Sequence, residues 1–193
     1  ISDINISKDI RVIKFYFVRH GQSEANAARL IADSTPKLTK RGREQAIETA
    51  NSLKDIKITK ILTSPLIRAR QTAEIIASEL GLHVGDIEVV DELTERSLGE
   101  CEGKPKDMES EKYITIDTER GFEPQATLIK RLLVALEMIK KECNDASGNV
   151  LVVGHVTAGF YLQQLAKGYR KITEFDEYYH MPNAVCKEVE IND

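Results

Sequence analysis

The sequence predicts an α/β fold: a three-layer α/β/α sandwich in which helices cover both faces of a mostly parallel sheet. Two patterns support this prediction. Apolar runs of strand length alternate along the chain with longer segments whose apolar residues recur at helical spacing. The last run, at 185–191, alternates apolar with polar residues, which is typical of an edge strand.

The first predicted strand, at 14–18, is apolar and rich in aromatic residues. The helix that follows begins after Thr39, whose hydroxyl can accept a hydrogen bond from a free amide of the first turn. The apolar positions of this helix are Ala46, Ile47, Ala50 and Leu53. Their helical spacing predicts one buried face.

A second strand, at 60–63, leads into a second helix. Ser64 and Pro65 favour a helix start, because serine accepts hydrogen bonds from free amides and proline fits the first helical position. One face of this helix is apolar, with Ala69, Ala73, Ile76, Ala77 and Leu80. Gly81 is expected to end it, and residues 88–90 predict a third strand.

The rest of the chain contains one irregular segment and two further helices. Residues 99–122 carry glycine, proline and many charges, and they predict a short cap insertion. The long helix expected at 125–143 has Leu128, Leu132, Ala135, Leu136 and Ile139 on one side. A strand at 149–153 and a helix near 158–167 follow. No internal repeat is visible, so we expect a single domain over 1–193.

Charge and composition exclude several functional classes. The chain has 27 basic and 31 acidic residues, a net charge of −4, which argues against broad binding to nucleic acid. No apolar run is long enough to span a membrane, and the first ten residues lack the apolar block of a signal peptide. We therefore expect neither a nucleic-acid nor a membrane partner.

The three cysteines, Cys101, Cys143 and Cys186, are widely spaced and form no CxxC pair. They predict neither a disulfide framework nor a zinc site, and free thiols are typical of a reducing compartment. We therefore expect a cytoplasmic protein without a metal centre.

Cationic side chains follow three of the predicted strands. Arg19 and His20 end the first, Arg68 follows the second by way of Ser64, and His155 follows the strand at 149–153. Ligands of open α/β sheets bind at the carboxyl ends of the strands. If these strands are neighbours, two arginines and two histidines meet at one rim. Such a cluster suits a dianionic phosphoryl group.

Arg68 lies in the first turn of its predicted helix. Helical side chains lean toward the N-terminus of their helix, so this guanidinium can reach the strand ends, where the helix dipole also favours an anion. The other histidines, His83 and His180, lie in no recognisable motif, and we expect them to be structural.

Five motifs extend this pattern. Residues 18–26, VRHGQSEAN, resemble RHGxSxxN. Segments similar to LTxxGxxQA, SPxxRAxQT, LxE…GxxEG and a second histidine motif follow in order, at 38–46, 64–72, 93–103 and 153–155. Together these motifs resemble the histidine phosphatase superfamily, the phosphoglycerate mutase-like proteins. The resemblance runs from about Phe15 to about Leu165, most of the chain.

The resemblance implies that His20 is the nucleophile, which becomes phosphohistidine, and that Glu95 is the proton donor. A neutral imidazole nitrogen can attack phosphorus while the other ring nitrogen holds its proton, which we expect to face a backbone carbonyl. Glu95 would protonate the departing oxygen and later take a proton from water. The implied chemistry needs no metal or other cofactor.

The resemblance also implies the residues that bind the phosphoryl group, which are Arg19, Asn26, Arg68 and His155. Gln22 and Ser23 belong to the same loop and are expected to line the pocket. The arginines and a protonated His155 would stabilise the charge of the transferring group. Val156 and Thr157 replace the small residues that follow this histidine in many relatives. They bear on substrate choice, although the amides after His155 could still point at phosphate.

The implied reaction is hydrolysis of a small phosphorylated metabolite. The cap between Gly103 and Gly121 is short, so water should reach phosphohistidine more easily than in the mutases, which carry longer insertions. The motif at 93–103 favours this branch over phosphohistidine-protein phosphatases. The alternatives are phosphoglycerate mutase-type transfer and a non-catalytic scaffold that binds a phosphorylated ligand. The strand at 185–191 could be a free edge or a dimer seam, so we expect a monomer or a homodimer.

Overall fold

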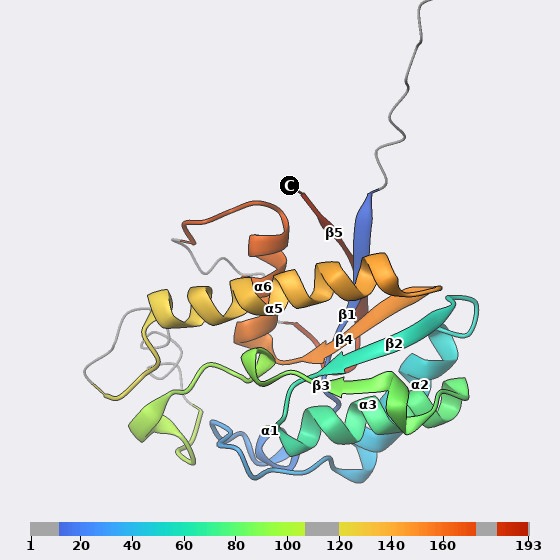
Figure 1. The fold of residues 1–193 in the computed structure, drawn as a ribbon. Coiled ribbons are helices and arrows are strands. Elements are labelled where there is room, and N and C mark those ends of the chain that lie inside the picture. The colour runs from blue at the N-terminus through green and yellow to red at the C-terminus, as the bar shows by residue number, and fades with distance from the viewer. Residues whose placement is uncertain (1–11, 107–119, 173–180, 193) are drawn as a thin grey trace, which may run out of the picture.

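The computed structural model describes residues 12–106, 120–172 and 181–192, in which a five-stranded sheet lies between two layers of helices (Figure 1). The strand order is β3-β2-β4-β1-β5. The strands are β1 (Ile13–Arg19), β2 (Ile58–Thr63), β3 (Ile87–Val89), β4 (Asn149–Gly154) and β5 (Cys186–Ile191). The first four run parallel, and β5 pairs antiparallel with β1 at one edge. This confirms the predicted α/β fold class and the edge strand.

The helices are α1 (Glu24–Ala28), α2 (Lys40–Ser52), α3 (Ile67–Leu80), α5 (Gln125–Asp145) and α6 (Val156–Ala166). Three short 3-10 turns join them: η1 (Val84–Asp86), η2 (Asp91–Leu93) and η3 (Gly99–Cys101). Helices α5 and α6 cover one face of the sheet, and α2 and α3 cover the other (Figure 1).

Strand β1 contributes to the hydrophobic core on both faces of the sheet. Phe15 and Phe17 pack among side chains of α5 and α6, whereas Val18 packs among those of α2 and α3. Successive side chains of a strand point to opposite faces, so a fully apolar run fits a strand covered on both sides. The run at 14–18 therefore predicts a buried strand correctly.

Two details of the helices differ from the expectation. Ile47 of α2 is 38% exposed, and Thr49 is buried instead, with its hydroxyl between the carbonyl oxygens of Gln45 and Ala184, which share its single proton. Helix α3 begins at Ile67, later than the Ser64 start that was expected. The Ser64 hydroxyl still accepts from the Leu66 amide, and it also faces a histidine described below.

The ends of the predicted cap insertion at 99–122 are tied to the rest of the molecule. At its start, Gly103 and Lys104 exchange backbone hydrogen bonds with Ile31, at 2.8 and 2.9 Å, and the Lys106 amide donates to the Arg29 carbonyl. At its end, the Arg120 carbonyl accepts from the Glu100 amide, which joins the two ends of the cap to each other, and Phe122 packs in a small hydrophobic cluster with Ile31, which lies outside the cap. Residues 107–119 and His180 lie outside the described residues, as do the charged cap residues Asp107, Glu109, Glu111 and Lys112.

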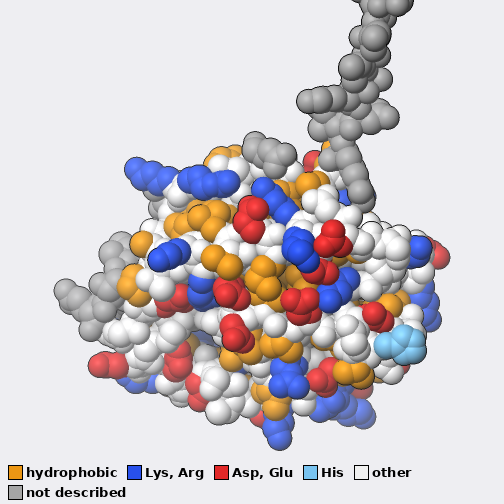
Figure 2. Space-filling model, in the orientation of Figure 1, with side chains coloured by type: hydrophobic (Ala, Val, Ile, Leu, Met, Phe, Trp, Pro, Cys, Tyr) orange, Lys and Arg blue, Asp and Glu red, His pale blue; other side chains and the backbone are white. Residues whose placement is uncertain are grey.

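Charged side chains of both signs are interspersed over the face of the molecule that α5 crosses, as Figure 2 shows. This matches the small negative net charge. Within the described part of the chain, none of the helices combines the length and the apolar character needed to cross a bilayer.

Helix α6 approaches β1 so closely that Gly159 has no room for a side chain. A Cβ added there would overlap the Phe17 ring, which is buried in the core. We expect Gly159→Ala to lower the free energy of unfolding by about 1–3 kcal/mol through overpacking. Urea denaturation would measure the change. Gly85→Ala is the matched control, because a Cβ at Gly85 meets no atom within 4 Å. Equal stability of the two variants would contradict the close contact.

Candidate active site

The candidate site lies at the carboxyl ends of three neighbouring parallel strands, β2, β4 and β1. The His20 amide donates to the Gly154 carbonyl at 3.0 Å, and the Ser64 amide donates to the Val153 carbonyl at 3.0 Å. These bonds continue the sheet past the ends of the strands. They bring His20, Ser64 and His155 together at the rim formed by the carboxyl ends of these strands.

His20 is buried, and its ring is held by its own loop. The Nδ1 atom lies 2.7 Å from the Gly21 carbonyl oxygen. Because a carbonyl oxygen can only accept, Nδ1 carries the ring proton and Nε2 keeps a lone pair. Burial, followed by the charges of Arg19 and Arg68, lowers the pKa of His20 well below its usual range. The ring is therefore neutral, and its proton faces a backbone carbonyl as expected.

His155 is fully buried beside His20, with the ring centroids 5.2 Å apart. Its Nε2 lies 2.7 Å from the Ser64 hydroxyl, and its buried Nδ1 has no hydrogen-bond partner in the described residues. Burial is the main cause that lowers the pKa of His155 well below its usual range, and the neighbouring His20 ring and the charges of Arg68 and Arg19 act in the same direction. This arrangement favours a neutral His155, so the expected protonated form requires an added negative charge nearby.

The two arginines are both anchored by main-chain carbonyls. Arg68 is only 2% exposed, and its Nη1 donates to the Asp33 carbonyl at 2.8 Å, while its buried Nε meets no acceptor in the described residues. Burial lowers the pKa of Arg68, and the charge of Glu95 opposes this most strongly. Arg19 Nη1 donates to the Met181 carbonyl at 2.5 Å. Arg68, in the first turn of α3, is close enough to His20 and His155 for its charge to act on both rings.

The loop after His20 is fixed by a capping box at the start of α1. The Ser23 amide donates to Asn26 Oδ1 at 3.1 Å, and the Asn26 amide donates to Ser23 Oγ at 3.3 Å. Ser23 is buried, and the Gln22 side chain accepts from the Thr39 hydroxyl at 2.9 Å. The side chains of Gln22 and Ser23 thus hold the loop in place. The side-chain amide of Asn26 is oriented by the Ser23 backbone amide, which donates to its oxygen.

Two of the motif segments support this loop through hydrogen bonds and backbone packing. The Gly21 amide donates to the Thr72 hydroxyl at 3.0 Å, and the Gln22 amide donates to Gln45 Oε1 at 2.8 Å. Gly21 and Gly42 pack backbone to backbone, because a Cβ on Gly21 would overlap the Gly42 carbonyl. The motifs at 38–46 and 64–72 therefore act by holding the histidine loop in place.

The Glu95 carboxylate lies at the N-terminus of α6, the helix that begins directly after His155. Its carboxylate accepts from the amides of Arg96, Thr157 and Ala158, at 2.9, 3.1 and 2.8 Å. The amides of Thr157 and Ala158, which were expected to be able to point at phosphate, are used by Glu95 instead. A carboxylate at this place also complements the helix dipole.

Arg131 and Asn183 carry site contacts that no sequence pattern marked. Arg131 of α5 donates to the Glu92 and Thr94 carbonyls, at 2.6 and 2.8 Å, and so holds the loop that carries Glu95. Asn183 donates to the His20 carbonyl at 2.9 Å. Both contacts join segments far apart in the chain, and only the folded topology brings them together.

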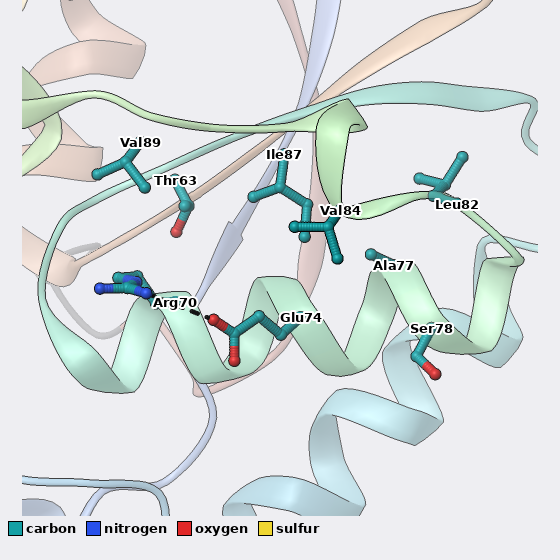
Figure 3. A pocket seen from close by; sticks show the side chains of 9 residues that line it. All are labelled: Thr63, Arg70, Glu74, Ala77, Ser78, Leu82, Val84, Ile87 and Val89. Atoms are coloured by element: carbon teal, nitrogen blue, oxygen red, sulfur yellow. Dashed lines mark ion pairs between the residues drawn. The ribbon is translucent and has the colours of Figure 1, made fainter.

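A separate cavity of about 370 Å³ lies between α3 and β3 (Figure 3). Its lining contains none of the candidate site residues. Arg70 and Glu74 form an ion pair at 3.8 Å along its wall, and the remaining lining is Thr63, Ala77, Ser78, Leu82, Val84, Ile87 and Val89.

Comparison with known proteins gives a consistent result. The sequence pattern of the histidine phosphatase superfamily (branch 1) matches residues 15–193. "Probable phosphoglycerate mutase GpmB" of Erwinia tasmaniensis is 33% identical over 154 residues, which cover 75% of this chain and 70% of that protein.

Two solved structures share the fold. A mycobacterial glucosyl-3-phosphoglycerate phosphatase has a TM-score of 0.73 and 21% identity, and the match covers 92% of this chain and 90% of that one. The alpha-ribazole phosphatase of Shigella flexneri has a TM-score of 0.71 and 22% identity, with 93% and 91% covered. Relatives named as mutases and as phosphatases therefore both resemble this chain.

We expect the protein to lose stability as the pH falls below about 6.5, the ordinary pKa of histidine. Because the pKa values of His20 and His155 are lowered by folding, the unfolded chain binds more protons than the native one in this range. The free energy of unfolding should then fall with pH, by up to about 1.4 kcal/mol per pH unit for each histidine.

Urea denaturation between about pH 7.5 and about pH 5.5 measures this slope. The double variant His20→Gln/His155→Gln should lose most of it, whereas His83→Gln, at an exposed site, should keep it. A double variant with the slope of the wild type would show that these histidines are not held neutral.

Proposed function

The chain belongs to the histidine phosphatase superfamily, and we propose that it is a phosphatase that hydrolyses a small phosphomonoester through a phosphohistidine on His20. One observation carries this proposal. His20 is a buried, neutral imidazole with its proton held on Nδ1 by the Gly21 carbonyl, beside the charges of Arg19 and Arg68. This is the state in which Nε2 can attack phosphorus.

In the first step, the Nε2 lone pair forms a bond to phosphorus while the bond from phosphorus to the ester oxygen breaks. The step starts from protonated Glu95, which gives its proton to the departing oxygen, so that an alcohol leaves and Glu95 becomes a carboxylate. In the second step, water attacks phosphorus and loses a proton to Glu95, and the nitrogen–phosphorus bond breaks. Inorganic phosphate leaves, and His20 and Glu95 return to their first states.

The phosphoryl oxygens would be bound by donors from four residues. Arg68 Nε and His155 Nδ1 are buried and meet no acceptor in the described residues, and a phosphoryl group would supply one. Arg19 and Asn26 would complete the set. A bound dianion would also raise the pKa of His155 and favour its protonated form, which matches the charge that develops during transfer.

We propose Glu95 as the proton donor because of where it is held. The amides of Thr157 and Ala158 fix its carboxylate at the start of α6, next to His155. The carboxylate is also close enough to Arg68 to raise the pKa of that guanidinium. The amide contacts therefore hold the Glu95 carboxyl next to His155 and near the charge of Arg68, which is where the proposed proton donor is needed.

Mutase activity is the second candidate, since the relative from Erwinia tasmaniensis is named for it. We favour hydrolysis, because the segment between Gly103 and Gly121 is short and leaves phosphohistidine open to water. A non-catalytic scaffold is disfavoured by the presence of His20 and Glu95 together. A cytoplasmic location fits the three free cysteines, all of which lie among the described residues.

Replacing the proposed nucleophile should abolish turnover. We expect His20→Ala to reduce hydrolysis of para-nitrophenyl phosphate by more than about a thousandfold. Wild-type protein quenched during turnover with a labelled substrate should carry acid-labile, base-stable phosphate, and His20→Ala should carry none. His83→Ala is the control and should keep wild-type activity.

Two results would count against this assignment. Equal activity in the wild type and His20→Ala would remove His20 as nucleophile. Interconversion of phosphoglycerates faster than release of inorganic phosphate from any phosphomonoester in a metabolite panel would favour the mutase.

A leaving-group comparison separates proton donation by Glu95 from its contacts with α6. Glu95→Gln should slow hydrolysis of an alkyl phosphate by about 10²–10⁴-fold, because an alkoxide leaves poorly without a proton. The loss should be much smaller for para-nitrophenyl phosphate, whose leaving group is stable as an anion. Glu100→Gln, at an exposed position, is the control. If Glu95 only holds α6, both substrates will be slowed by the same factor.

A further inference from the structure

We propose that Asn183 is a positioning residue that turns the Asn26 side chain so that its NH₂ group faces the phosphoryl site. The proposal rests on the proposed function, because it concerns the binding of the phosphoryl group. It adds to the site a segment near the C-terminal end of the chain, 163 residues from His20.

The segment from Met181 to Ala184 is fixed against the end of β1 by contacts that do not involve the Asn183 side chain. The Ala184 amide donates to the Arg19 carbonyl at 2.9 Å, and Arg19 Nη1 donates to the Met181 carbonyl. The Thr49 hydroxyl donates to the Ala184 carbonyl. Strand β5 then pairs with β1 from Cys186 onward. The backbone therefore delivers the Asn183 side chain to one defined place.

The orientation of the Asn183 amide is set by a backbone carbonyl. Its Nδ2 lies 2.9 Å from the His20 carbonyl oxygen, which can only accept, so the NH₂ group must face it. The same Nδ2 lies 3.3 Å from Asn26 Oδ1. Since an NH₂ group has two protons, Asn183 can donate to both acceptors at once.

The orientation of Asn26 follows from two donors on its oxygen. Its Oδ1 accepts from the Ser23 amide at 3.1 Å as well as from Asn183. A backbone amide can only donate, so the atom that faces both groups must be the oxygen. The NH₂ group of Asn26 therefore points away from these two donors. It is the part of the side chain that could donate to a phosphoryl oxygen.

This orientation matters because phosphoryl oxygens accept hydrogen bonds and do not donate them when ionised. An Asn26 turned the other way would present its own oxygen lone pairs to the phosphoryl group and repel it. The Ser23 amide alone favours the productive orientation, and Asn183 reinforces it from a second direction. Asn183 thus acts through Asn26, without touching the substrate itself.

The test uses Asn183→Asp, which has nearly the same shape but carries only acceptors. An aspartate at this place would repel Asn26 Oδ1 and attract the Asn26 NH₂ group, so it should turn the amide over. We expect the affinity for inorganic phosphate, measured by calorimetry and as competitive inhibition, to fall by about tenfold or more. KM for para-nitrophenyl phosphate should rise by a similar factor, with a smaller change in kcat.

Three further variants make the result specific. Asn183→Ala removes the donor without attracting the NH₂ group, so its loss of affinity should be smaller than that of Asn183→Asp. In an Asn26→Ala background, adding Asn183→Asp should change the phosphate affinity by less than about threefold. Asn192→Asp is the matched control near the same end of the chain, where the amide donates to the Lys167 carbonyl. It should bind phosphate as the wild type does.

The proposal is overturned if Asn183→Ala and Asn183→Asp lose affinity equally, or if the loss persists undiminished in the Asn26→Ala background. Either result would mean a general disturbance of the site. Wild-type affinity in Asn26→Ala would also overturn it, while leaving the phosphatase assignment intact. Wild-type protein that neither binds phosphate nor forms phosphohistidine would instead overturn the proposed function.

Discussion

The site depends on positive charge that is held in place by main-chain carbonyls. The guanidinium of Arg19 donates to the Met181 carbonyl, and that of Arg68 to the Asp33 carbonyl. A carbonyl fixes the direction of a guanidinium without cancelling its charge, whereas a carboxylate does both. Together with burial, which is the larger cause, this charge lowers the pKa of His20. The charge that would attract a phosphoryl group therefore also keeps the proposed nucleophile neutral.

The neutral His20 ring stays beside the charged arginines because hydrogen bonds and packing hold the backbone of its loop in place. The Gly21 amide is fixed by Thr72 and the Gln22 amide by Gln45, while Gly21 packs directly on Gly42. The two hydrogen bonds give the loop amides of Gly21 and Gln22 a partner, and the glycine contact fixes how closely the two backbones approach. Thr72 and Gln45, two residues of the motifs, thus help to determine the position of the His20 ring. The order of the strands determines which loops lie next to each other.

Local sequence patterns predict the strands and helices well, but they do not predict contacts between segments that lie far apart in the chain. The apolar run at 14–18 and the glycine at 81 are read correctly because strand burial and helix ends depend on neighbouring residues. Helix α3 begins later than Ser64 predicts, because Ser64 has the chemistry of a helix cap but its hydroxyl also faces His155. Asn183 reaches His20 only through the pairing of β5 with β1, which no spacing in the sequence encodes.

Backbone hydrogen bonds pair Arg29 and Ile31 with residues 103–106 at the start of the cap. This pairing lies between the cap and the residue that anchors Arg68. Asp33, which holds Arg68, lies just beyond this pairing, and the Arg120 carbonyl is bonded to the Glu100 amide at the other end of the cap. The first end of the cap is thereby held to the framework, and the second end is held to the first. Asp33 and Arg68 both lie outside the cap, so the contact that anchors Arg68 uses no residue of the cap. In the proposed phosphatase, substitutions in the cap would therefore leave the main-chain anchor of Arg68 in place.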